Sequence, residues 1–185
     1  IRNMPEKQDA KLVWMGEIMD KAVALGASRI LLGHHRNAEN HLTADEAAEQ
    51  MRTAIGTLAE MARERGLRAV VSNAVPFAVK GGVKDVRALY ADMPHAIHFA
   101  HCALAGEKPD REDLLDAEGI LLSAPLRDEF GQMIDAHLPL YSSELRGKVT
   151  EALAGIDMSR YAFVCLDGVY ESFDEMYLER KGYGL

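Results

Sequence analysis

The sequence predicts an α/β fold in which helical segments alternate with the strands of a parallel sheet. Five short apolar runs each end in polar residues, and helical patterns separate them; the runs are Ser28–His35, Leu67–Asn73, Ala96–Cys102, Gly119–Ser123 and Tyr161–Asp167. This rhythm is typical of β/α units around a parallel sheet. Because ligands bind at the carboxyl ends of such strands, the polar residues there are the first candidates for a functional site.

The helices are expected from the spacing of apolar residues and from start and stop signals. The clearest start is Thr43 followed by Glu46, a capping box in which each side chain satisfies a free main-chain amide. Gly26 and Gly66 stand where the first two helices are expected to end. The expected helices lie near 10–25, 43–65, 83–91, 110–117 and 143–154, and another begins near 171.

A long segment, Ala124–Tyr141, connects the fourth apolar run to the next helix. A loop of this length in a compact domain is usually functional, or it indicates that the segment has been assigned wrongly. Its charged residues Arg127, Asp128 and Glu129 are expected in an exposed loop, or in a loop that closes over the ends of the strands as a lid.

Composition indicates an ordinary globular protein, expected to form a single domain over residues 1–185. Hydrophobic residues make up 48% and charged residues 27%, and the formal net charge is −8. The acidic balance disfavours nucleic acid as a partner, because phosphate binding usually requires a basic face. No apolar run approaches the roughly 18 residues needed to span a membrane.

The N-terminus has no apolar signal segment, and the two cysteines, Cys102 and Cys165, do not form a Cys-x-x-Cys motif. Two reduced cysteines packed as small apolar groups are typical of cytoplasmic proteins. The sequence therefore predicts a cytoplasmic location.

Several segments resemble, in order, the strands of xylose isomerase-like barrels, a superfamily that includes sugar isomerases, sugar epimerases and apurinic endonucleases. The stretch Ala22–Ile30 resembles the entry to the third strand, Leu67–Asn73 is similar to the fourth, and His98–Gly106 is similar to the fifth. Asp135–Leu140 matches the Asp-x-His stretch after the sixth strand, and Tyr161–Asp167 lies where the seventh strand ends.

The resemblance implies a TIM (β/α)₈ barrel, a fold that typically takes about 250 residues. Strands three to seven are apparent in this chain, and strands one, two and eight are not. An arc of five strands leaves two open parallel edges, which are poor ends for a sheet. We expect either that the barrel is incomplete because the chain is part of a longer polypeptide, or that a second copy covers the edges in a homo-oligomer.

The resemblance also implies a divalent metal held by Glu, Asp, His and Glu at the ends of strands four to seven. This sequence departs from that set. Ser72 stands in place of the first Glu, His98 in place of the Asp, and Asp167 in place of the last Glu. The histidine position falls at Leu122 or Ser123.

Other groups that can bind a metal remain at the strand ends: His98, His101, Asp135, His137 and Asp167. Together they predict a nitrogen-rich site suited to zinc, manganese or iron. Asp135 and His137 match the pair that binds an additional metal in the endonuclease branch, and Asp135 would orient His137. The alternative is that these groups hydrogen-bond to one another without any metal.

Three functions follow from the resemblance. In the first, an isomerase or epimerase acts on a small polyol or keto-sugar, with Asp167 and His101 as catalytic residues. The residues expected to bind this substrate are His34, His35, Ser72 and Asn73. The second is a non-catalytic barrel that binds a small molecule or serves as a subunit. The third is a metal-dependent phosphodiesterase like the apurinic endonucleases.

Overall fold

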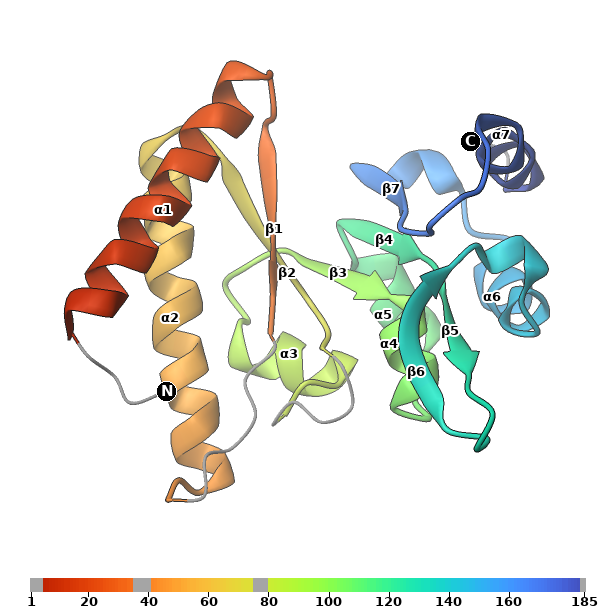
Figure 1. The fold of residues 1–185 in the computed structure, drawn as a ribbon, viewed down its shortest axis with the longest axis horizontal. Coiled ribbons are helices and arrows are strands. Elements are labelled where there is room, and N and C mark those ends of the chain that lie inside the picture. The colour runs from red at the N-terminus through yellow and green to blue at the C-terminus, as the bar shows by residue number, and fades with distance from the viewer. Residues whose placement is uncertain (1–4, 35–40, 75–79, 184–185) are drawn as a thin grey trace.

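A curved sheet of five parallel strands forms the centre of the molecule (Figure 1). The computed structural model describes residues 5–34, 41–74 and 80–183. The strands, in their order across the sheet, are β1 (Arg29–Gly33), β2 (Arg68–Ser72), β3 (His95–His98), β4 (Gly119–Leu122) and β7 (Phe163–Leu166). All four pairings between neighbours are parallel, and the strands curl into half of a barrel. The five predicted strands and their order are therefore confirmed.

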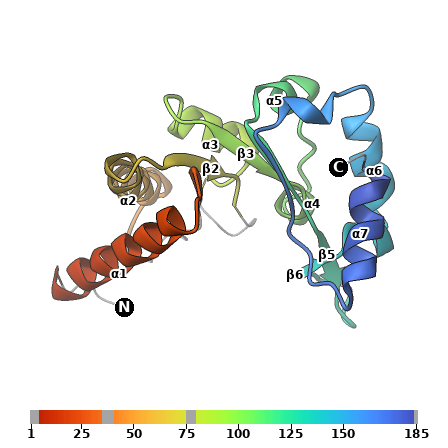
Figure 2. The same cartoon turned by 90° about the horizontal axis from the view of Figure 1, so that it is seen from above.

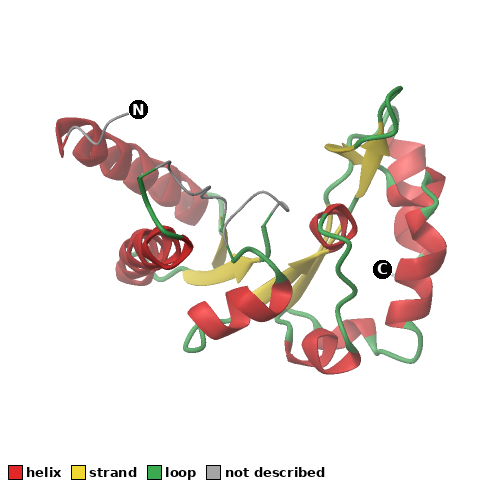
Figure 3. Ribbon diagram, turned by 90° about the horizontal axis from the view of Figure 1, so that it is seen from below, coloured by secondary structure: helices red, strands yellow, loops and turns green. Residues whose placement is uncertain are grey.

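Helices follow or precede each strand along the chain. Figure 2 shows α1 and α2 at one end of the curved sheet and α6 and α7 at the other, and Figure 3 shows most of the helices (red) along the outside of the strands (yellow). Within the described residues, no helix is both long enough and apolar enough to cross a bilayer. The helices are α1 (Pro5–Ala24), α2 (Ala44–Glu64), α3 (Val83–Leu89), α4 (Phe99–Leu104), α5 (Arg111–Asp116), α6 (Leu145–Leu153) and α7 (Phe173–Gly182), with 3₁₀ turns at Leu140–Ser142 and Met158–Arg160.

Alternate residues of each strand face opposite sides of the sheet. On the outer side, Val71 packs in one cluster with Ile55 of α2, and Leu122 packs in another with Val149 of α6. On the inner side, Val70, Ala96 and Leu121 form a small cluster with Phe163. The sheet is thus covered by helices on one face, while the other face turns toward the barrel interior.

The start of α2 has the predicted capping box. The Thr43 hydroxyl accepts a hydrogen bond from the Glu46 amide at 3.2 Å, and the Glu46 carboxylate accepts one from the Thr43 amide at 2.8 Å. These contacts satisfy main-chain amides that have no partner within the helix.

The segment predicted as a long connection is instead a β-hairpin. Strands β5 (Ala124–Arg127) and β6 (Met133–Leu138) pair antiparallel, separate from the main sheet. Its turn is closed by Asp128, whose carboxylate accepts from the amides of Phe130 and Gln132. The charged residues 127–129 therefore lie at the end of a paired ribbon.

The third predicted strand, Ala96–Cys102, is too long at its carboxyl end. Strand β3 ends at His98, and α4 begins at Phe99. His101 and Cys102 accordingly lie in the first turns of a helix, on which residues three or four apart share a face.

Candidate metal centre

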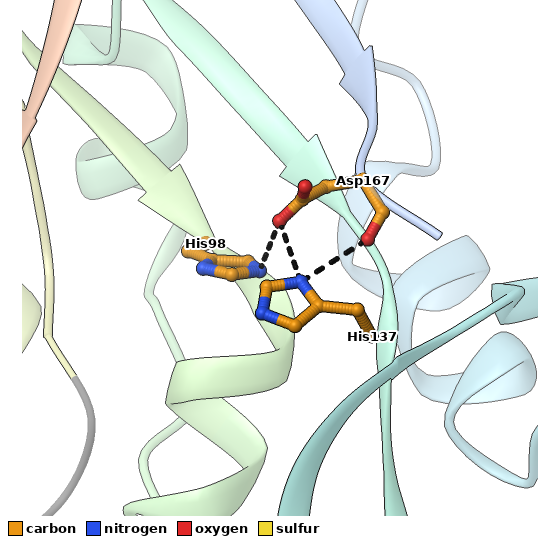
Figure 4. A group of neighbouring side chains, drawn as sticks. All are labelled: His98, His137 and Asp167. Carbon is orange, nitrogen blue, oxygen red and sulfur yellow. Dashed lines mark hydrogen bonds and ion pairs between the residues drawn. The ribbon is translucent and has the colours of Figure 1, made fainter. Parts of the chain in front are cut away.

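Three side chains from distant parts of the chain meet at the carboxyl end of the sheet (Figure 4). His98 ends β3, His137 lies in β6, and Asp167 follows β7. One carboxylate oxygen of Asp167 lies 3.2 Å from Nε2 of His98 and 3.0 Å from Nδ1 of His137. One donor atom from each of the three residues lies within 4.8 Å of the other two.

The donor set fits a divalent transition metal. Two imidazole nitrogens and one carboxylate oxygen suit zinc, iron or manganese better than a hard ion such as magnesium. Ligands bound about 2.1 Å from one ion lie about 3.0–3.4 Å apart in octahedral or tetrahedral geometry. The two contacts of Asp167, at 3.0 and 3.2 Å, already agree with that spacing.

The cluster has a closed side and an open side. The His98 side chain is 3% exposed, whereas those of His137 and Asp167 are 40% and 33% exposed. His98 thus forms the buried base of the cluster, and His137 and Asp167 form its exposed side.

His137 has an unusual main-chain conformation. Its φ angle is +47°, in the left-handed region that residues other than glycine rarely adopt. Its carbonyl accepts a hydrogen bond from the Val169 amide at 2.7 Å, which ties the end of β6 to the loop after β7. Strain of this kind often accompanies a functional site, and here it directs the imidazole toward Asp167.

A second histidine–aspartate pair lies beside the first cluster. His101 Nε2 is 3.1 Å from the Asp135 carboxylate, and the same oxygen is 3.5 Å from Nε2 of His137. His101 Nδ1 lies 3.0 Å from the main-chain carbonyl of Asn73. All five residues predicted as metal ligands therefore lie in one connected group, but only His98, His137 and Asp167 form the compact set.

The structure resolves the histidine position that the resemblance left open. Leu122 is buried on the outer face with the helices, whereas Ser123 is 0% exposed and lies with its hydroxyl 2.9 Å from His98 Nε2. Of the two positions, Ser123 is thus the one that faces the site, and the prediction did not place this residue there. The alternation of β4, with Leu121 inside and Leu122 outside, was the available signal.

The residues expected to bind substrate lie in the interior. His34 is 0% exposed, and its Nδ1 is 2.8 Å from the hydroxyl of Tyr90, which belongs to the outer core around α2. Ser72 and Asn73 are 4% and 2% exposed. All three are thus buried within the described part of the chain, and their role toward a substrate stays a prediction. His35 lies outside the described residues.

The nearby thiol of Cys102 does not belong to the compact set of donor atoms. Burial raises the pKa of Cys102 to about 12. The thiol accepts a hydrogen bond from the side-chain amide of Asn73 at 3.4 Å.

No protein-family model matches the sequence, and no curated protein matches it significantly. Solved structures share the fold. The TTHB071 protein from Thermus thermophilus, soaked with ZnCl₂, has a TM-score of 0.65 and 18% identity; the match covers 100% of this chain and 72% of that one. A xylose isomerase-like TIM barrel protein from Mycobacterium smegmatis in complex with magnesium gives 0.62 and 16%, covering 96% and 66%.

The IolI protein with a bound zinc atom is also similar, with a TM-score of 0.59 and 15% identity over 88% of this chain and 62% of that one. The molecule therefore has the fold of a partial α/β barrel, similar to the barrels of these proteins. The chain spans 62% to 72% of the lengths of these three similar chains.

Proposed function

We propose that the protein binds one divalent transition metal and acts on a small polyol or keto-sugar by metal-assisted proton transfer. The observation that carries this proposal is the convergence of His98, His137 and Asp167 at the carboxyl end of the sheet. Ligand sites of parallel α/β proteins lie at this end of the strands.

When bound, the metal supplies positive charge beside a carbonyl or hydroxyl oxygen of the substrate. Asp167 and the two imidazoles hold it, and the exposed side of the cluster admits the substrate. Removal of a proton from the carbon next to a carbonyl then requires a base within hydrogen-bonding reach.

Asp135 and His101 are the groups placed to move that proton. The Asp135 side chain is 23% exposed, so its carboxylate is accessible, and His101, 5% exposed, lies behind it at 3.1 Å. A carboxylate that accepts a hydrogen bond from an imidazole N–H is held in one orientation. In this arrangement Asp135 accepts the proton and His101 positions it.

The similar structures support the metal part of the proposal. One of them was soaked with ZnCl₂, one has a bound zinc atom and one is in complex with magnesium. The nitrogen-rich set of this chain favours zinc, iron or manganese over magnesium.

The test is deuterium exchange. Protein loaded with zinc or manganese is incubated with a panel of ketopentoses and ketohexoses in D₂O, and NMR follows the hydrogens next to the carbonyl. We expect exchange with at least one sugar, and a loss of about 10²–10⁴-fold in Asp135→Asn, in which the three metal ligands are retained.

One control variant and two outcomes complete this experiment. Asp92→Asn, an exposed substitution on the loop before β3, is expected to exchange like the wild type. Metal binding without exchange of any sugar would overturn the proton-transfer proposal and favour a non-catalytic barrel that binds a small molecule. Absence of metal binding would overturn the proposal as a whole.

A further inference from the structure

The side chain of Asn73 faces the interior behind the metal cluster. Its Oδ1 accepts a hydrogen bond from the main-chain amide of His98 at 2.7 Å, and its Nδ2 donates to the main-chain carbonyl of His98 at 3.2 Å. A single primary amide thus engages both main-chain polar groups of a residue 25 positions away. Only a side chain with a donor and an acceptor in one plane can do this.

This contact lies where the pairing of β2 with β3 ends. The ladder joins Val71 to His95 and Ser72 to Ala96, and Asn73 is the next residue along β2. After His98 the chain turns into α4, so no further main-chain rung is formed. The hydrogen bonds of the Asn73 side chain replace that main-chain pairing and fix the point at which β3 ends and α4 begins.

Asn73 also contacts the imidazole of His101, through its main chain. Its main-chain carbonyl, which can only accept, lies 3.0 Å from Nδ1 of His101. Nδ1 of His101 therefore carries a hydrogen, and Nε2 is directed toward Asp135. The rings of His98 and His101 pack with centroids 3.7 Å apart, so each ring restricts the other.

We infer that Asn73 is the positioning residue for His98 and His101, an inference that rests on the proposed metal site. This role differs from the substrate contact that the sequence predicted for Asn73, which stays a prediction. Aspartate at this position would lack the donor for the His98 carbonyl, and alanine would lack both contacts. Groups that orient metal ligands typically contribute about 10–100-fold to metal affinity.

The first test uses the metal-free wild-type protein. Nitrogen-15 NMR of the imidazoles is expected to show a hydrogen on Nδ1 of His101, with scalar coupling through the hydrogen bond to the carbonyl carbon of Asn73. An His101 ring without a hydrogen on Nδ1 would contradict the inference, whether or not metal binds.

The second test compares Asn73→Asp and Asn73→Ala with the wild type in zinc competition against a chelator, under conditions in which circular dichroism shows folded protein. We expect zinc to bind about 10–100-fold more weakly in both variants. The imidazole resonances of His98 and His101 should shift in the metal-free variants.

Ile55→Ala provides the matched control, because Ile55 is buried in the core around α2 and away from the site. It should lower the melting temperature and leave zinc affinity within about twofold. Wild-type affinity in the Asn73 variants would overturn the inference and leave the metal site intact. If the wild type binds no zinc, the proposed function fails, and the imidazole resonances alone decide the role of Asn73.

Discussion

Asp167 is the residue on which two imidazoles converge. Its carboxylate is the only negative charge among the three residues of the compact cluster, so Asp167→Asn removes charge while it keeps the shape. We expect zinc affinity to fall by more than about 100-fold, since loss of a direct ligand exceeds the usual effect of an orienting group. Competition with a chelator measures the change. Zinc affinity equal to that of the wild type would exclude Asp167 as a ligand.

Glu179 supports the site from a distance. It is 2% exposed, and one of its oxygens accepts from the amide of Leu140 at 3.1 Å. Leu140 lies three residues after His137, so Glu179 of α7 fixes the chain that follows β6. Burial raises the pKa of Glu179 above its ordinary value of 4.5, although the hydroxyl of Tyr170 and the amide of Leu140 act in the opposite direction.

This raised pKa leads to a pH-dependent stability. A carboxyl group with a higher pKa in the folded state stabilises the fold below its unfolded pKa, and that contribution is lost as the pH rises through the folded value. Glu179→Gln should therefore become progressively more stable than the wild type as the pH rises from 4.5. Urea unfolding between about pH 4 and pH 8 measures the difference, with exposed Glu151→Gln as the control. A difference that stays constant with pH would refute this account.

The individual contacts of the site were harder to predict than its members. The rule that strand ends carry function identified His98, His101 and Asp167, and resemblance identified Asp135 and His137. Periodicity shows which side of a strand a residue faces, but not which hydrogen bonds it makes. The pattern therefore did not give the contact of the Asn73 side chain with the His98 main chain, nor that of His34 with Tyr90.

Among the elements, the strands could be predicted because they are buried apolar runs. The hairpin β5–β6 was not predicted. Pro125 interrupts the first strand, but Ile134–Leu138 alternates between apolar and polar residues, and this was the available signal for the second. The end of β3 was misplaced because His98–Cys102 continues an apolar pattern into α4.

Strands β4 and β7 are held together by a close contact inside the half-barrel. A Cβ atom on Gly119 would lie 2.3 Å from Cζ of Phe163, and the Phe163 ring packs on the inner cluster of Val70, Ala96 and Leu121. Gly119→Ala must displace this ring, and overpacking typically costs about 1–3 kcal/mol. Chemical denaturation measures the loss.

Restoring the space is the informative control for this contact. The double variant Gly119→Ala with Phe163→Leu should be less destabilised than the sum of the two single variants, because the smaller side chain makes room for the methyl group. Strict additivity of the two changes would contradict the proposed contact.

At the scale of the whole molecule, the site links three separate segments of the chain. Its ligands come from β3, from the hairpin and from the loop after β7, and among the described residues β1 and β7 have no neighbour on their outer sides. A ligand that binds only the folded state stabilises it by about 2.7 kcal/mol at 100 times its Kd. Zinc should therefore raise the melting temperature of the wild type and leave His98→Ala unchanged. An equal shift in both proteins would assign the effect to another site.

The central claim is that His98, His137 and Asp167 bind one metal ion together. An anomalous difference map, recorded at the zinc absorption edge from crystals soaked in zinc, tests this claim most directly. The account requires one strong peak about 2.0–2.2 Å from His98 Nε2, His137 Nδ1 and a carboxylate oxygen of Asp167. A fully soaked crystal without a peak at these three residues, or with zinc bound only elsewhere, would contradict it.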